Sequence, residues 1–118
     1  GLSKTTAEEK NRRRDAIQAA TLNAMLVPLK VMRLSCNSME VLKAMAETGN
    51  PNSVSDAGVG ALCARAAVRG ALLNVRINAG GLSDSPKASQ ILAEAAAIDM
   101  KAEVLEKEIL EIVEKKIK

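Results

Sequence analysis

The chain has 118 residues, 47% of them apolar, and it contains no Phe, Tyr, Trp or His. A core without aromatic rings must be built from aliphatic side chains and methionine, and such a core suits close-packed helices. The absence of histidine excludes the usual zinc sites and any hydrolytic triad with a histidine base, so we expect no metal. A fold of this size buries only about two-thirds of its unfolded surface, so we expect a partner to add stability.

The net charge is +3, and the excess of basic residues lies at the N-terminal end. There, Lys4, Lys10 and the arginines at 12–14 stand against Glu8 and Glu9. Such an end can bind a polyanion or can simply be the solvated end of a helix. A nucleic acid is the weaker choice of partner, because no aromatic side chain is available to stack on a base. No apolar run reaches the roughly 18 residues of a membrane span and no signal segment is seen, so we expect a cytoplasmic protein outside the membrane.

A long first helix is predicted, from Thr6 to about Thr48. Thr6 and Glu9 have the spacing of a capping box, which predicts that this helix begins at Thr6 and ends near Thr48. Pro28 lies inside it, so either one helix kinks there or two helices meet, and we favour the kink because the apolar pattern keeps its phase. The apolar positions recur at steps of three and four and are expected to face the core. They are Ile17, Ala20, Ala24, Val27, Val31, Leu34, Ser38, Leu42 and Met45.

Sulfur-containing side chains accompany this stripe. Met25, Met32 and Met39 recur every seven residues beside it. This spacing is compatible with a lining of an adaptable binding groove or with packing in the core, and we interpret the three residues as core filler. Cys36 and Cys63 lie far apart in apolar stretches, and we interpret them as buried, inert thiols.

A second helix is predicted from Asp56 to about Asn78. Gly49 is expected to end the first helix in the left-handed conformation, residues 50–52 to form a turn, and Ser53 or Ser55 to cap the second helix. Because this segment is apolar nearly all round, we expect it to be buried on most sides.

Two sides of this central helix differ in chemistry. Arg65, Arg69 and Arg76 share one narrow stripe. The opposite side has only small or short polar residues, namely Asp56, Gly60, Cys63, Ala67, Gly70, Asn74 and Asn78. Another backbone or a flat ligand can approach such a side closely, and we favour helix packing over a ligand groove. Each interior glycine costs about 1 kcal/mol of helix propensity, and close approach is the expected compensation.

A third helix is predicted to begin at residues 83–86 and to run to the C-terminus. Its apolar positions alternate steps of four and three, which indicates a heptad seam that packs on a helix of the same chain or of a second copy. They are Ile91, Ala95, Ile98, Ala102, Leu105, Ile109 and Ile112. The expected fold is therefore all-α, an antiparallel bundle of long helices in a single domain spanning residues 1–118. It has a Pro-kinked first helix, a buried central helix rich in small residues and a heptad-patterned last helix.

Three stretches of the sequence resemble one protein family. Residues 49–59 (GNPNSVSDAGV) and 69–78 (RGALLNVRIN) resemble the second half of the formiminotetrahydrofolate cyclodeaminase and methenyltetrahydrofolate cyclohydrolase family, and residues 2–10 (LSKTTAEEK) resemble its entry into the same helix. The resemblance covers essentially the whole chain, which then corresponds to the C-terminal half of a larger domain. Leu72 departs from the family pattern, since an aromatic residue is common there, and this weakens any ring-stacking role for that position.

The resemblance implies a tetrahydrofolate derivative as substrate, a homodimer, and a reaction at its one-carbon unit. Cyclodeaminases convert 5-formiminotetrahydrofolate to 5,10-methenyltetrahydrofolate, and cyclohydrolases hydrolyse the methenyl bridge. Both reactions need proton transfer at the one-carbon unit, which a positioned carboxylate can supply. The resemblance implies that the family's Gly-rich helix start and its suspected catalytic aspartate lie upstream of Gly1. We therefore expect Asp56, Asn74, Arg76 and Asn78 to form the part of the folate pocket or of the dimer seam that this half contributes, where they bind or position rather than transfer the proton. Without the upstream catalytic segment, the chain alone is not expected to be active. The alternative is a non-catalytic helical assembly module that retains the family fold.

Overall fold

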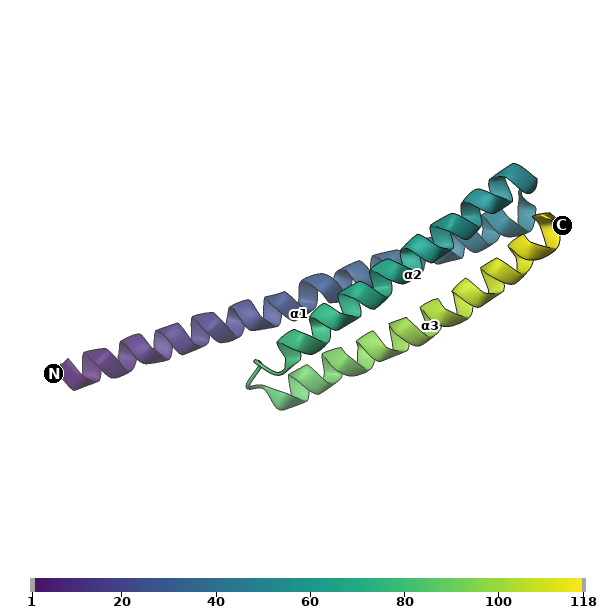
Figure 1. The fold of residues 1–118 in the computed structure, drawn as a ribbon. Coiled ribbons are helices and arrows are strands. Elements are labelled where there is room, and N and C mark those ends of the chain that lie inside the picture. The colour runs from purple at the N-terminus through teal and green to yellow at the C-terminus, as the bar shows by residue number, and fades with distance from the viewer. Residues whose placement is uncertain (1, 118) are drawn as a thin grey trace.

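The computed structural model describes residues 2–117, with the side chains of residues 6–117. Its three helices are α1 (Leu2–Thr48), α2 (Pro51–Ala79) and α3 (Ser85–Ile117). Successive helices run antiparallel and each contacts the other two, so the described part of the chain is a helical bundle without strands (Figure 1). The predicted all-α fold is confirmed.

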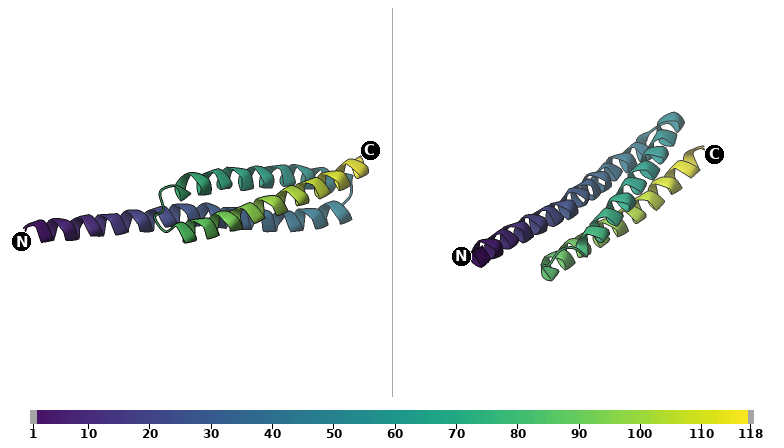
Figure 2. Two further views of the ribbon diagram at one scale, coloured as in Figure 1. Left: turned by 90° about the horizontal axis from the view of Figure 1, so that it is seen from below. Right: turned by 60° about the vertical axis from the view of Figure 1, so that its left-hand side comes forward.

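The bundle is elongated, with extents of 77 × 21 × 16 Å. The N-terminal part of α1 extends past the turn between α2 and α3 and has no helix beside it (Figure 2). All side chains of residues 6–17 are exposed. Because α1 begins at Leu2, the prediction that it begins at Thr6 is wrong. The helix passes through Pro28 without interruption, so the alternative of two helices meeting there is also wrong.

The core lies on the methionine-bearing side of α1. Met25, Met32 and Met39 are fully buried against aliphatic residues of α2 and α3, which confirms their interpretation as core filler. The stripe that was predicted to face the core is instead largely exposed. Its exposed members include Ile17, Val27, Val31, Leu34 and Met45. Both stripes are predominantly apolar, so helical periodicity alone did not decide which of them is buried.

Asn50 caps α2. Its Oδ1 accepts hydrogen bonds from the backbone N–H groups of Asn52 (3.1 Å) and Ser53 (3.0 Å). Pro51 takes the first helical position. A backbone N–H group at this position has no acceptor within the helix, so proline is tolerated there. The predicted turn at 50–52 and the predicted cap at Ser53 or Ser55 are therefore wrong, and α2 begins about one turn earlier than expected.

Gly49 ends α1 by a mechanism other than the predicted one. Its backbone is not left-handed, since no described glycine has a positive φ. The Gly49 N–H donates to the carbonyl oxygen of Met45 at 2.8 Å, and a Cβ atom on Gly49 would lie 2.6 Å from the same oxygen. Glycine is thus required here by close contact rather than by handedness.

The start of α3 and the direction of its seam agree with the sequence. Asp84 Oδ1 accepts a hydrogen bond from the Lys87 N–H group at 3.0 Å, and Pro86 lies in the first turn. The heptad seam faces α1 and α2 of the same chain. Its buried members are Ile91, Ala95, Ala102, Leu105 and Ile109. Of the two predicted packing partners for this seam, the helices of its own chain are the observed ones.

α2 is buried on one side only, so the prediction that most of its sides are covered is wrong. Close contacts with side chains of the other helices explain why two positions of α2 are glycine. A Cβ atom on Gly58 would lie 3.3 Å from Val113 Cγ1, and one on Gly60 would lie 3.0 Å from Leu42 Cδ2.

The helix α2 is long and apolar enough to cross a membrane. Core helices of soluble proteins meet the same criteria of length and composition. Only 33% of the most apolar stretch of α2 is buried inside the bundle.

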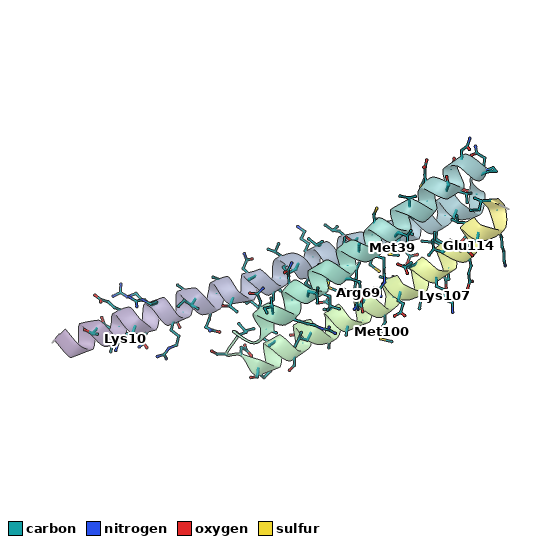
Figure 3. The ribbon with its side chains drawn as sticks, viewed as in Figure 1. Lys10, Met39, Arg69, Met100, Lys107 and Glu114 are labelled. Carbon is teal, nitrogen blue, oxygen red and sulfur yellow. The ribbon has the colours of Figure 1, made fainter. Side chains whose placement is uncertain are left out.

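A polar network joins α2 to α3. Arg65 Nη1 lies 2.6 Å from Asp99 Oδ1, and Arg69 Nη1 lies 2.8 Å from Asp99 Oδ2. Arg69 lies between α2 and α3 (Figure 3). Burial alone raises the pKa of the Asp99 carboxyl, but hydrogen bonds and charge from Arg65 and Arg69 outweigh this effect and hold that pKa below its usual value. Further ion pairs join α1 to α3, namely Arg33–Glu94, Lys43–Glu108 and Lys101–Glu40.

The methionine core predicts a large effect of truncating Met32. This side chain is 0% exposed, whereas Met100 on α3 is 68% exposed. We expect Met32→Ala to lower the free energy of unfolding by about 2–5 kcal/mol, because it removes buried surface and leaves a cavity. Urea unfolding followed by circular dichroism measures this loss. The matched change Met100→Ala should have almost no effect, and equal effects of the two changes would contradict the assignment of the core.

The Asp99 network predicts a pH-dependent stability. A carboxyl group whose folded-state pKa is lowered stabilises the fold above its unfolded-state pKa of about 3.9, and this contribution is lost as the pH falls through the folded-state pKa. We therefore expect Asp99→Asn to be clearly less stable than the unmodified chain at pH 7, and the difference to shrink at acidic pH below about 4. Thermal unfolding between pH 2 and 7 tests this, with the exposed Asp56→Asn as the control. A difference that does not change with pH would assign the loss to packing instead.

Candidate functional site

A groove of about 430 Å³ runs between the middle of α1 and the C-terminal half of α2. Its walls are apolar and its polar groups are two amide side chains at one end. The lining residues are Ala24, Val27, Pro28, Val31, Ala67, Ala71, Asn74 and Asn78. None of them is titratable, so the groove can bind and orient a molecule but offers no side chain for proton transfer.

Pro28 explains the position of Asn78. A proline has no N–H group for the carbonyl oxygen four residues before it, so the Ala24 oxygen lacks its helical partner. Asn78 Nδ2 approaches that oxygen at 3.4 Å and also donates to the Asn74 carbonyl oxygen at 2.8 Å. The amide of Asn78 is thereby fixed at the mouth of the groove, with Nδ2 engaged by the backbone of both helices.

Asn74 is the available polar group of the groove. Its side chain is exposed, and within residues 6–117 it makes no hydrogen bond. An amide side chain offers two donor hydrogens and one acceptor oxygen. Asn74 can therefore pair with a group that presents a donor and an acceptor side by side, and Val27 and Val31 supply apolar surface in the same groove.

The four predicted binding residues do not come together. Asn74 and Asn78 both line the groove. Asp56 precedes Asn74 by eighteen residues, which is about 27 Å along a helix, and it is exposed in the second turn of α2. Arg76 is exposed and does not line the groove. The groove therefore includes two of the four residues, and the assignment of all four to folate binding or to a dimer seam stays a prediction.

Sequence reasoning missed the α1 side of the groove. Val27, Pro28 and Val31 were assigned to the core stripe or to a kink, yet they form one wall. The signal was Pro28 itself, because a proline inside a helix leaves a carbonyl oxygen that a nearby donor can use. The small-residue side of α2 was expected to be covered by close packing, and this prediction is wrong for most of that side. Only Gly60 and Asn78 are partly buried there, and the exposed residues are Asp56, Cys63, Ala67, Gly70 and Asn74.

A second depression and two free thiols lie outside this groove. A depression of about 290 Å³ beside the α2–α3 turn is spanned by Gln18, which donates to the Gly81 carbonyl oxygen at 3.0 Å and accepts from the Ser83 N–H group at 2.7 Å. These bonds tie the turn to α1. Both cysteines are free thiols. Cys36 is buried, which raises the pKa of its thiol, whereas Cys63 is exposed, so the prediction that both are buried is half wrong.

The described residues form an α-helical bundle with an uncharged, amide-ended groove on its surface. The comparisons with known proteins give the family. A family profile described as formiminotransferase-cyclodeaminase matches residues 1–97. The chain belongs to this family, which confirms the resemblance read from residues 2–10, 49–59 and 69–78.

Three relatives show the extent of the likeness. The methenyltetrahydrofolate cyclohydrolase of Methylorubrum extorquens is 41% identical over 117 residues, which cover 99% of this chain and 56% of the relative. The formimidoyltransferase-cyclodeaminases of Rattus norvegicus and Gallus gallus are 36% and 40% identical over 83 residues, 70% of this chain and 15% of each relative. The chain thus spans about half the length of the first relative and a much smaller share of the others.

The contact between Asn78 and Ala24 predicts an energetic coupling with Pro28. We expect Asn78→Ala to lower the free energy of unfolding by about 0.5–1.5 kcal/mol, because the Ala24 carbonyl oxygen loses its donor. In a Pro28→Ala background residue 28 regains its N–H group and bonds that oxygen, so the same change should have a smaller effect. A double-mutant cycle by urea unfolding measures the coupling. Asn74→Ala is the matched control, and an equal effect of Asn78→Ala in both backgrounds would contradict this role of Pro28.

Proposed function

We propose that the protein to which this chain belongs acts in folate one-carbon metabolism on a tetrahydrofolate derivative. The reaction is either cyclodeamination of 5-formiminotetrahydrofolate to 5,10-methenyltetrahydrofolate or hydrolysis of the methenyl bridge. The observation that carries this proposal is the 41% identity over 99% of the chain to a relative named methenyltetrahydrofolate cyclohydrolase. Hydrolysis of the bridge has the greater support, since the relatives named cyclodeaminase match a shorter part of the chain.

In this proposal the groove binds the folate and does not carry out proton transfer. A pteridine ring has hydrogen-bond donors and acceptors side by side on its edge, which the Asn74 amide complements, and its face suits the apolar wall of Val27 and Val31. Hydrolysis adds water to the bridge carbon, breaks one carbon–nitrogen bond, and needs a base to remove a proton from the water. No groove residue can serve as that base, so we assign it to a part of the protein outside this chain.

A second candidate is a helical assembly module without catalytic activity. The observation that favours it is the absence of any titratable side chain among the groove residues. The two candidates differ in a simple measurement, because a hydrolase consumes methenyltetrahydrofolate and an assembly module does not.

We also propose that the protein is a cytoplasmic homodimer outside the membrane. The outer side of α3 supports self-association, because Met100 and Val104 are exposed there and Met100 points away from the other two helices (Figure 3). A location outside the membrane is supported by Arg65 and Arg69 in the middle of α2, which are engaged by Asp99. A nucleic acid remains the weaker choice of partner.

The function is tested by the loss of methenyltetrahydrofolate absorbance on adding the full-length product of the encoding gene. We expect turnover, and we expect Asn74→Ala to raise KM about tenfold with a smaller change in kcat, because Asn74 binds the substrate and does not take part in the chemistry. Asp56→Ala, far from the groove on α2, is the control and should leave both constants unchanged. No turnover by the full-length product supports the assembly module, and an Asn74→Ala enzyme with an unchanged KM excludes the groove as the folate site.

A further inference from the structure

The polar end of the groove offers more hydrogen-bond acceptors than donors. Asn78 Nδ2 lies against two backbone carbonyl oxygens, those of Ala24 and Asn74, so the nitrogen of this amide is the atom that faces them. In the described part of the chain, no donor is bonded to the other end of the amide, Asn78 Oδ1. Asn78 therefore brings to the groove an acceptor that is not in use, and no spare donor.

The Ala24 carbonyl oxygen is a second acceptor with spare capacity. Pro28 has no N–H group to donate to it, and half-buried Ala24 and Pro28 both line the groove. The distance from this oxygen to Asn78 Nδ2 is 3.4 Å, longer than an ordinary N–H···O hydrogen bond of about 2.7–3.2 Å. Because a carbonyl oxygen has two lone pairs, this long contact leaves it able to accept a further and stronger bond.

Two acceptors at one end of an apolar groove select the edge of the ring that binds there. An edge with adjacent N–H donors pairs with them, whereas an edge of acceptors leaves every group unpaired. In a tetrahydropterin ring the 2-amino group carries two such hydrogens and adjoins the N3–H group. The 4-oxo group follows on the other side of N3. The side chain of Asn74 has a donor and an acceptor side by side, which is the complement of N3–H and the 4-oxo oxygen.

We propose that Pro28 makes the groove selective for the 2-amino edge of a pterin. The Ala24 carbonyl oxygen and Asn78 Oδ1 accept the two hydrogens of the 2-amino group, and the Asn74 amide pairs with the N3–H and 4-oxo groups beside it. This assignment rests on the proposed function, since its ligand is a tetrahydrofolate derivative. Pro28 is a positioning residue here, because it acts through the oxygen of Ala24, which it leaves without a helical donor.

Binding of two compounds to the full-length product of the encoding gene tests this selectivity. They are tetrahydrofolate and its analogue in which a methyl group, similar in size, replaces the 2-amino group. Calorimetry measures both dissociation constants without turnover. We expect the methyl analogue to bind about thirtyfold more weakly, because each of two neutral hydrogen bonds contributes about fivefold.

The outcomes separate the selectivity from the function. Equal binding of the two compounds overturns the role of the 2-amino edge and leaves the proposed reaction untouched. Failure of both compounds to bind also overturns it, and the turnover of methenyltetrahydrofolate, measured separately, then decides the proposed reaction.

Pro28→Ala removes the selectivity that the freed oxygen supplies. Residue 28 then has an N–H group, which bonds to the Ala24 oxygen within the helix. The ratio of the two dissociation constants should fall from about thirtyfold to about fivefold, because one of the two acceptors is no longer available. The variant should also be more stable, since proline is unfavourable inside a helix, so a smaller ratio cannot come from unfolding. An unchanged ratio in Pro28→Ala contradicts the proposal.

Val27→Ala is the matched control in the apolar wall of the groove. It removes apolar surface and no hydrogen-bonding group, so both compounds should bind more weakly by similar factors and the ratio should stay at about thirtyfold. Asn78→Ala, which removes the second acceptor, should lower the ratio as Pro28→Ala does. A ratio that falls equally in Val27→Ala assigns the effect to a loosened groove and overturns the role of the Ala24 oxygen.

Discussion

Packing of the methionine side of α1 against α2 and α3 is the interaction on which the rest of the structure depends. Met25, Met32 and Met39 fill the space between three helices without any aromatic ring, because an unbranched thioether side chain adapts to an irregular interior. Once this side of α1 is buried, Val27, Val31 and Leu34 must face outward. The groove beside Pro28 and the exposed apolar stripe of α1 both follow from that single choice.

The helices and the family were predictable from the sequence, since both depend on local patterns. Period-3.6 spacing, Pro86 near a helix start and the runs at 49–59 and 69–78 need no tertiary information. The rotation of α1 was not predictable in the same way. The stripes through Met25 and Val27 are both apolar, and only the positions of α2 and α3 decide between them. The cap at Asn50 was missed because Ser53 and Ser55 are equally good capping residues by type.

The candidate site was predicted in part. Asn74 and Asn78 lie one turn apart on one helix, so their proximity required only the helical rise, and the same rise excluded Asp56 as their neighbour. The contribution of α1 depends on the pairing of two helices, which periodicity does not specify. The hydrogen bond from Asn78 to Ala24 shows how a local defect at Pro28 becomes a tertiary contact, with a side chain from another helix in place of the missing backbone donor.

The elongated shape affects how the size of this chain must be measured. Its radius of gyration is 20.2 Å, whereas a compact domain of the same length has a value of about 13 Å. A rod of this kind diffuses and elutes from a sizing column like a considerably heavier sphere. Elution volume alone would therefore make a single copy of this 12.4 kDa chain resemble a dimer, and only a method that reports mass independently of shape, such as light scattering or sedimentation equilibrium, can count the copies.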